Sequence, residues 1–105
     1  MFRKKLSSLD VGEVTVSICQ DYYEKVINGC PPEDDLFGRA RYLLNARNQA
    51  AGMEFFAQRL DLEFGDDSTL ALPVTSLVVN LEKMIEFNFS KMSDEQLDAF
   101  ENSPA

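Results

Sequence analysis

The 105-residue sequence contains no histidine and no tryptophan. Histidine is the commonest general base near neutral pH and a frequent ligand of transition metals, so its absence removes the usual catalytic triads and many metal sites. The five glycines are scattered singly, and no phosphate-binding glycine pattern occurs. We therefore expect a protein that is not an enzyme, with no catalytic residues, no metal and no cofactor.

Long hydrophobic runs are also missing. No stretch of about 18 apolar residues is present, which argues against a membrane span. The basic start, Met1–Lys5, resembles the start of a signal peptide, but polar residues interrupt the segment where an apolar run should follow. We expect a single domain over residues 1–105, in the cytoplasm and without membrane contact.

Cysteine is scarce. Cys19 and Cys30 show neither metal-binding nor redox spacing. Disulfides are rare in the cytosol, so we expect two free thiols and no bridge.

Charge is abundant but uneven. The net charge is −8; residues 1–59 carry eight acids and eight bases, whereas residues 60–105 carry ten acids against two lysines. A field of this kind repels nucleic acid and anionic membranes and attracts basic proteins. We therefore expect a basic protein partner, and no direct contact with nucleic acid.

The strongest local pattern predicts a β-hairpin, with strands at about 58–64 and 69–74. Leu60, Leu62 and Phe64 alternate with acids, and Leu70, Leu72 and Val74 continue the period of two. The Gly65–Ser68 segment between them has the composition of a turn. Pro73 late in the second strand is typical of an edge strand.

Residues 10–28 allow two interpretations. Four β-branched residues within Val14–Ile18 predict a strand at 13–19, followed by a helix at 21–28 that ends at Gly29. Val11, Val14, Ile18, Tyr22 and Val26 also follow a helical spacing, so a single helix over 10–28 remains the alternative.

Helical signals cover much of the remaining chain. Pro31-Pro32 ends the preceding element, and the acids 33–35 either complement the next helix dipole or bind a cation. We predict helices at 36–56, with a break near Gly52, at 77–87 after a Thr75 or Ser76 cap, and from the Ser93–Gln96 capping box to Glu101. Residues 84–89 alternate and are an alternative short strand. The fold class expected is α+β, with the hairpin and a third strand near 13–19 packed against three or four helices.

Residues 60–104 resemble the bacterial domain of unknown function 2442. The resemblance involves Leu62, Phe64, Asp66, Leu70, Pro73 and Val74, followed by Ser93, Leu97, Ser103 and Pro104. The family usually continues with a strand that bears tryptophan and aspartate, which this chain lacks. Some members are proposed antitoxin partners, so the resemblance favours a binding role and carries over no functional residues.

These observations predict a small acidic protein that binds and blocks a basic partner, as antitoxins, immunity proteins and phage inhibitors that mimic nucleic acid do. The expected contact surface consists of acids from the hairpin and the last helix: Asp61, Glu63, Asp66, Asp67, Asp94, Glu95, Asp98 and Glu101.

The alternative is a homodimeric or higher-order assembly module, because four phenylalanines are many for so small a core: Phe55, Phe56, Phe87 and Phe89. A nucleic-acid surface would depend on four arginines, which lack interleaved aromatic residues: Arg39, Arg41, Arg47 and Arg59.

Overall fold

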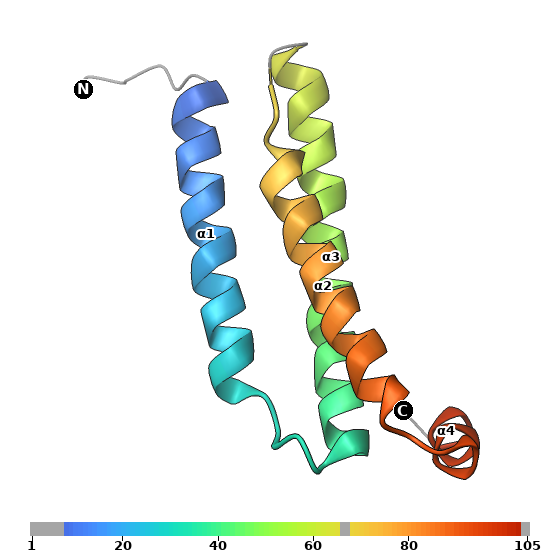
Figure 1. Cartoon of the computed structure of the whole chain (residues 1–105). Coiled ribbons are helices and arrows are strands. Elements are labelled where there is room, and N and C mark those ends of the chain that lie inside the picture. The colour runs from blue at the N-terminus through green and yellow to red at the C-terminus, as the bar shows by residue number, and fades with distance from the viewer. Residues whose placement is uncertain (1–7, 66–67, 104–105) are drawn as a thin grey trace.

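The computed structural model describes residues 8–65 and 68–103, with no side chains described for residues 8–10. This part of the chain forms four helices: α1 Ser8–Gly29, α2 Leu36–Phe64, α3 Ala71–Ser90 and α4 Asp94–Glu101. The three long helices run alternately down, up and down, and α4 crosses below the lower end of α3 (Figure 1). The domain is all-α, and the expected α+β class is wrong, because the described residues contain no strand.

The expected strand at 13–19 is instead part of α1, so the single-helix alternative is correct there. Thr15, Cys19 and Val26 recur at helical spacing and turn toward the other helices, whereas Val14, Val16 and Ile18 are exposed. The Thr15 hydroxyl donates a 2.7 Å hydrogen bond to the Val11 carbonyl within the helix. Packing of this stripe overrides the β propensity of the branched residues.

The expected hairpin is also wrong, because residues 58–64 end α2 and residues 71–74 begin α3. The period of two fails at Leu72, which is exposed, although Leu70 and Val74 are buried. The buried positions continue at helical spacing along α3 through Leu77, Val78, Leu81 and Ile85. The helical stripe of buried residues extends over 16 residues, from Leu70 to Ile85, whereas the alternation that predicted the second strand involves only three residues. The longer pattern determines the structure.

Asp61 and Pro73 together explain the connection between α2 and α3. Leu70, the N-cap residue of α3, makes no side-chain cap of its own. Instead, the carboxylate of Asp61 in α2 accepts hydrogen bonds from the backbone N–H groups of Leu70 and Ala71, at 2.7 and 3.0 Å. Pro73 lies in the first turn of α3. The N–H groups of a first turn have no acceptor within the helix, so the missing N–H of proline costs no hydrogen bond there. The prediction that Pro73 lies in an edge strand is therefore wrong.

Helix α2 is longer than expected. It passes through Gly52 without the predicted break, and its N-terminus is capped by Asp35, which accepts from the backbone N–H of Gly38. Its buried face is rich in alanine (Ala40, Ala46, Ala50 and Ala57), so that the larger side chains of α3 can approach closely. Helices α2 and α3 consequently make the most extensive contact in the domain.

Helix α1 is held mainly at its C-terminal half, by tyrosines. The hydroxyl of Tyr42 donates to the carbonyl of Val26 at 2.9 Å, and the hydroxyl of Tyr22 donates to the carbonyl of Ala46 at 3.2 Å. Tyr23 reaches the sulfur of Met84 at 3.9 Å. In the N-terminal half of α1, Val11 packs against the core and Gly12 lies close to the side chain of Leu70.

For the chain after α2, two further predictions are wrong and one is confirmed. Helix α3 continues to Ser90, so residues 84–89 form no strand, and it begins before the expected Thr75 or Ser76 cap. The capping box is confirmed: Ser93 and Gln96 bond each other's backbone N–H groups at the start of α4.

Helix α4 is anchored by aromatic contacts. The ring of Phe100 packs edge-on against Phe37 of α2, at a centroid distance of 5.6 Å, and against Phe89 of α3, at 5.4 Å. Nearby, the buried side chain of Asn88 donates a 2.9 Å hydrogen bond to the carbonyl of Leu36. The lower end of the bundle is therefore fixed by both apolar and polar contacts.

Candidate interaction surface

An open apolar groove of about 490 Å³ lies between α1 and the second half of α2. Its walls come from Val11–Cys19 and Gly52–Leu60, and the start of α3 closes its floor. The residues that line it are Val11, Val14, Thr15, Ile18, Cys19, Gly52, Met53, Phe56, Ala57, Leu60, Leu70 and Val74. None of these side chains carries a charge, so the groove suits an apolar occupant.

Three large apolar side chains in this groove are unusually exposed. Val14 is 58% exposed, Ile18 is 52% exposed and Phe56 is 66% exposed. They come from two helices and line the same cavity. Single exposed hydrophobic residues are common, but several that converge on one site mark a surface for another molecule.

The groove exists because of where small residues fall in the sequence. Gly52 lies in the middle of α2, and a methyl group added at its Cα would meet nothing within 4 Å. On the opposite wall Thr15 is the inward residue one turn before Cys19. The small residues Thr15 and Gly52, on opposite walls, leave open space between the larger side chains that also line the groove.

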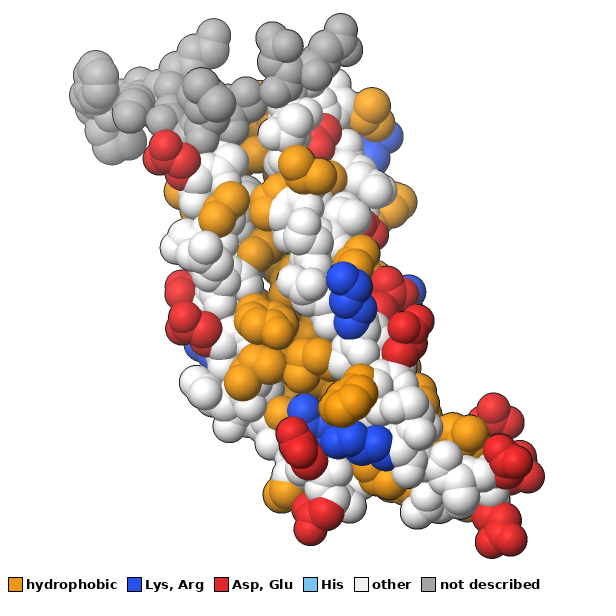
Figure 2. Space-filling view, viewed as in Figure 1, with side chains coloured by type: hydrophobic (Ala, Val, Ile, Leu, Met, Phe, Trp, Pro, Cys, Tyr) orange, Lys and Arg blue, Asp and Glu red, His pale blue; other side chains and the backbone are white. Residues whose placement is uncertain are grey.

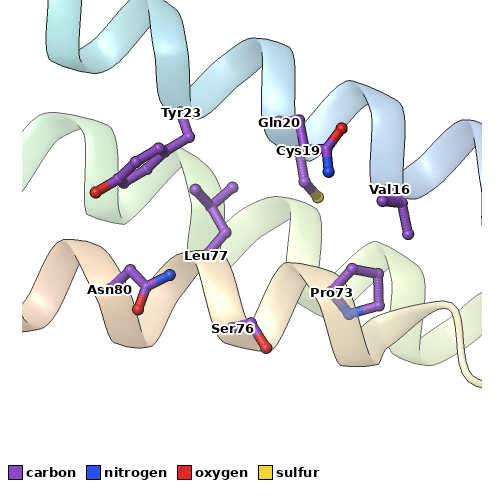
Figure 3. A pocket seen from close by; sticks show the side chains of 8 residues that line it. All are labelled: Val16, Cys19, Gln20, Tyr23, Pro73, Ser76, Leu77 and Asn80. Carbon is purple, nitrogen blue, oxygen red and sulfur yellow. The ribbon is translucent and has the colours of Figure 1, made fainter.

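A second, more polar groove of about 320 Å³ lies on the other side of α1, against α3. Figure 3 shows Tyr23 and Cys19 of α1 directed toward α3, and Leu77 directed toward α1. Gln20, Ser76 and Asn80 also line this groove. In Figure 2, apolar side chains mark the boundary between α1 and α3 as a continuous stripe. Helix α1 therefore has an open groove along each flank.

The ionisable groups near α1 are shifted by burial. Burial raises the pKa of the Cys19 thiol. Burial also raises the pKa of Cys30, and Arg39 lowers it in part. Both cysteines are free; the helix that follows Cys19 extends about 15 Å toward Cys30, too far for a disulfide. Thiols held in the protonated form are poor nucleophiles.

Asp61 was predicted to contact a basic partner, but in the structure its carboxylate accepts hydrogen bonds from the start of α3. Desolvation raises its pKa, but the hydrogen bonds from the Ser68 hydroxyl and from the Ala71 and Leu70 N–H groups outweigh this effect, so that the pKa lies below its usual value. Asp61 is therefore a helix-capping carboxylate.

The other predicted contact acids that the structure describes do not form one surface. Glu63 is exposed at the end of α2, whereas Asp66 and Asp67 lie outside the described residues. The other four are exposed on α4: Asp94, Glu95, Asp98 and Glu101. Helix α4 lies at the opposite end of the molecule from the end of α2 (Figure 1), and its acids form a group at the lower right of Figure 2. The structure keeps the α4 acids together and separates them from Glu63.

Three of the four arginines contact groups within the chain. Arg47 forms a 3.2 Å ion pair with Glu82 of α3, and Arg39 donates to the carbonyl of Pro31 at 2.9 Å. Arg41 donates to the hydroxyl of Ser103 at 2.7 Å and lies over the ring of Phe100. These three arginine side chains therefore stabilise the packing of the bundle.

Two further properties concern metals and membranes. Within residues 8–65 and 68–103, no group of three potential ligands could hold a metal ion. In the same residues, no helix combines the length and the apolar character that crossing a bilayer requires.

The sequence carries a partial signal for the groove. Val14 and Ile18, like Gly52 and Phe56, are spaced four residues apart and so share one face of a helix. The first pair belongs to the helical stripe of the single-helix alternative, whereas the strand at 13–19 places no such emphasis on it. The Phe55-Phe56 pair was recognised as an excess of apolar surface, but no pattern indicated which of the two faces α1.

Comparison of the chain with protein-family models, with curated proteins and with solved structures finds no match.

Proposed function

We propose that this protein is a non-catalytic helical interaction module that binds another protein chain in the groove between α1 and α2. The observation that carries the proposal is the convergence of Val14, Ile18 and Phe56, each more than half exposed, on one uncharged cavity. Covering such a surface removes apolar area from water and stabilises a complex.

The other chemistry of the domain agrees with a binding role. The cysteine pKa values are raised, and the lowered pKa of Asp61 is explained by its three hydrogen bonds. None of these shifts resembles a pair of groups tuned for proton transfer. A cytosolic location, where free thiols such as Cys19 persist, is part of this proposal.

The test is photocross-linking in the cells from which the protein comes. Benzoylphenylalanine replaces Phe56 in one variant and Phe55 in the other. The two positions are adjacent in sequence and 66% and 68% exposed, but only Phe56 lines the groove. We expect protein adducts from position 56 and few from position 55. Equal yields, or none from position 56, would contradict the proposal.

A second candidate function is that α4 binds a basic protein. This keeps the hypothesis of an acidic blocking protein but limits the contact surface to the acids of α4. It is favoured by the four exposed carboxylates that an eight-residue helix presents together. Such a surface speeds association at low salt more than it strengthens the final complex.

The α4 candidate has its own test. The double variant Asp98→Asn/Glu101→Gln should slow association with a basic partner and reduce the dependence of the rate on salt. Glu63→Gln, at the other end of the molecule, serves as the control. If both variants change the association rate equally, α4 is not the contact.

A further inference from the structure

We infer that the occupant of the α1–α2 groove is the same face of a second copy of this chain, in a two-fold symmetric dimer. This inference rests on the proposed function, because it names the partner of the same groove. It is argued from the size of the face, from its charge and from the arrangement of Phe56 and Gly52.

The face is large enough for a stable dimer. Helix α1 has 22 residues and is therefore about 33 Å long, and two adjacent helices are about 22 Å wide. The projected area is roughly 700 Å², and the corrugated accessible area is larger. A stable interface removes about 800 Å² from each partner. The α1–α2 face therefore reaches this area along the whole length of α1, of which the groove occupies about half.

The charge of the face suits a second copy. The groove part of the face is nearly neutral: residues 11–20 contain only Glu13 and residues 49–60 contain only Glu54 and Arg59, so these two segments together carry −1 of the net −8. The four acids of α4 lie beyond this face, at the end of the molecule. Two copies can therefore meet without strong like-charge repulsion, and the face offers a basic protein little attraction.

The groove and its rim are complementary to each other. Phe56 projects at the rim, and Gly52 lies one turn before it on the same side of α2, with open space above its Cα. In a two-fold contact, Phe56 of each copy can enter the groove of the other. A glycine in the middle of an exposed helix reduces helix stability, and close approach of a second backbone explains its presence here.

The test is sedimentation equilibrium of the purified full chain over a range of concentrations. We expect a monomer–dimer equilibrium for the unaltered protein. Phe56→Ser should raise the dimer dissociation constant about thirtyfold or more, as loss of an aromatic anchor does. Phe55→Ser should leave it within about threefold, since peripheral contacts contribute little. Circular dichroism of each variant checks that the helices remain.

A variant on the opposite wall provides an independent measurement. Ile18→Ser should weaken the dimer in the same direction as Phe56→Ser, because both side chains line the groove. A chain that is monomeric at all concentrations, or equal effects of Phe55→Ser and Phe56→Ser, would overturn the inference. If the purified chain is monomeric while position 56 cross-links to a different protein in cells, the dimer is wrong and the proposed function stands. Absence of position-56 adducts refutes the proposed function itself.

Discussion

The backbone N–H of Leu70 donates a 2.7 Å hydrogen bond to the carboxylate of Asp61, nine residues earlier in the chain. This bond joins the last turn of α2 to the N-cap residue of α3, and Ala71 and Ser68 donate to the same carboxylate. A residue on one helix thus supplies the cap that the next helix lacks. The close pairing of α2 and α3, on which the α1–α2 groove depends, begins at this contact.

Replacement of this cap should destabilise the domain. Asp61→Ala leaves the first N–H groups of α3 without their acceptor, and we expect a loss of about 1 to 2 kcal/mol in the free energy of unfolding. Urea denaturation measures the change. Glu63→Ala, two residues away and exposed, is the control and should lie within about 0.5 kcal/mol of the unaltered protein. Equal losses in the two variants would show that Asp61 has no special role.

The same contact predicts a dependence of stability on pH. The folded-state pKa of Asp61 lies below its usual value of 3.8, so the carboxylate stabilises the fold fully above that value. This contribution should be lost as the pH falls from about 4 through the folded-state pKa. Asp61→Asn cannot titrate, so the difference in unfolding free energy between the two proteins should shrink over this range. A difference that stays constant as the pH falls would contradict the assignment.

Removal of the Phe100 ring should release α4 while leaving the long helices paired. Phe100→Ala deletes the edge-on contacts with Phe37 and Phe89 and the contact with Arg41. Each aromatic pair contributes about 0.5 to 1.5 kcal/mol beyond its buried area. We therefore expect faster amide exchange in α4 and little change in the middle of α3, as measured by hydrogen–deuterium exchange. Uniform acceleration along the chain would show that α4 does not move separately.

The tyrosine that fixes the end of α1 provides a matched comparison. Tyr42→Phe removes a hydroxyl that donates to the Val26 carbonyl at 2.9 Å, and should reduce the unfolding free energy by about 1 kcal/mol. Tyr23→Phe removes only a 3.9 Å contact with the Met84 sulfur and should change it by less. Thermal unfolding of the two variants measures the difference. A larger loss for Tyr23→Phe would contradict the assigned contacts.

The sequence predicted the parts of the fold that local chemistry determines. Pro31-Pro32 separates α1 from α2, and the Ser93–Gln96 capping box opens α4, because each needs only neighbouring residues. The hairpin was wrong because Leu70 and Val74 fit a period of two as well as the longer helical stripe. The local alternation could not reveal that Asp61 accepts the N–H of Leu70, nine residues later, and so caps the next helix.

The candidate surface was predictable only in part. An excess of exposed phenylalanine indicated an interface, but the groove requires that Ile18 and Phe56, 38 residues apart, face each other across two helices. That relationship depends on the rotation of α1 about its axis, which the tyrosine hydrogen bonds fix. The acidic excess at the end of the sequence likewise says nothing about which acids share a surface.

The most direct measurement of the central claim is fluorine NMR of the purified chain with 4-fluorophenylalanine placed at position 56 or at position 55. If the α1–α2 groove receives a second copy, the resonance at position 56 shifts as the protein concentration rises from micromolar to millimolar, and the resonance at position 55 stays unchanged. If neither resonance changes, or if both change equally, a self-associating groove between α1 and α2 is contradicted.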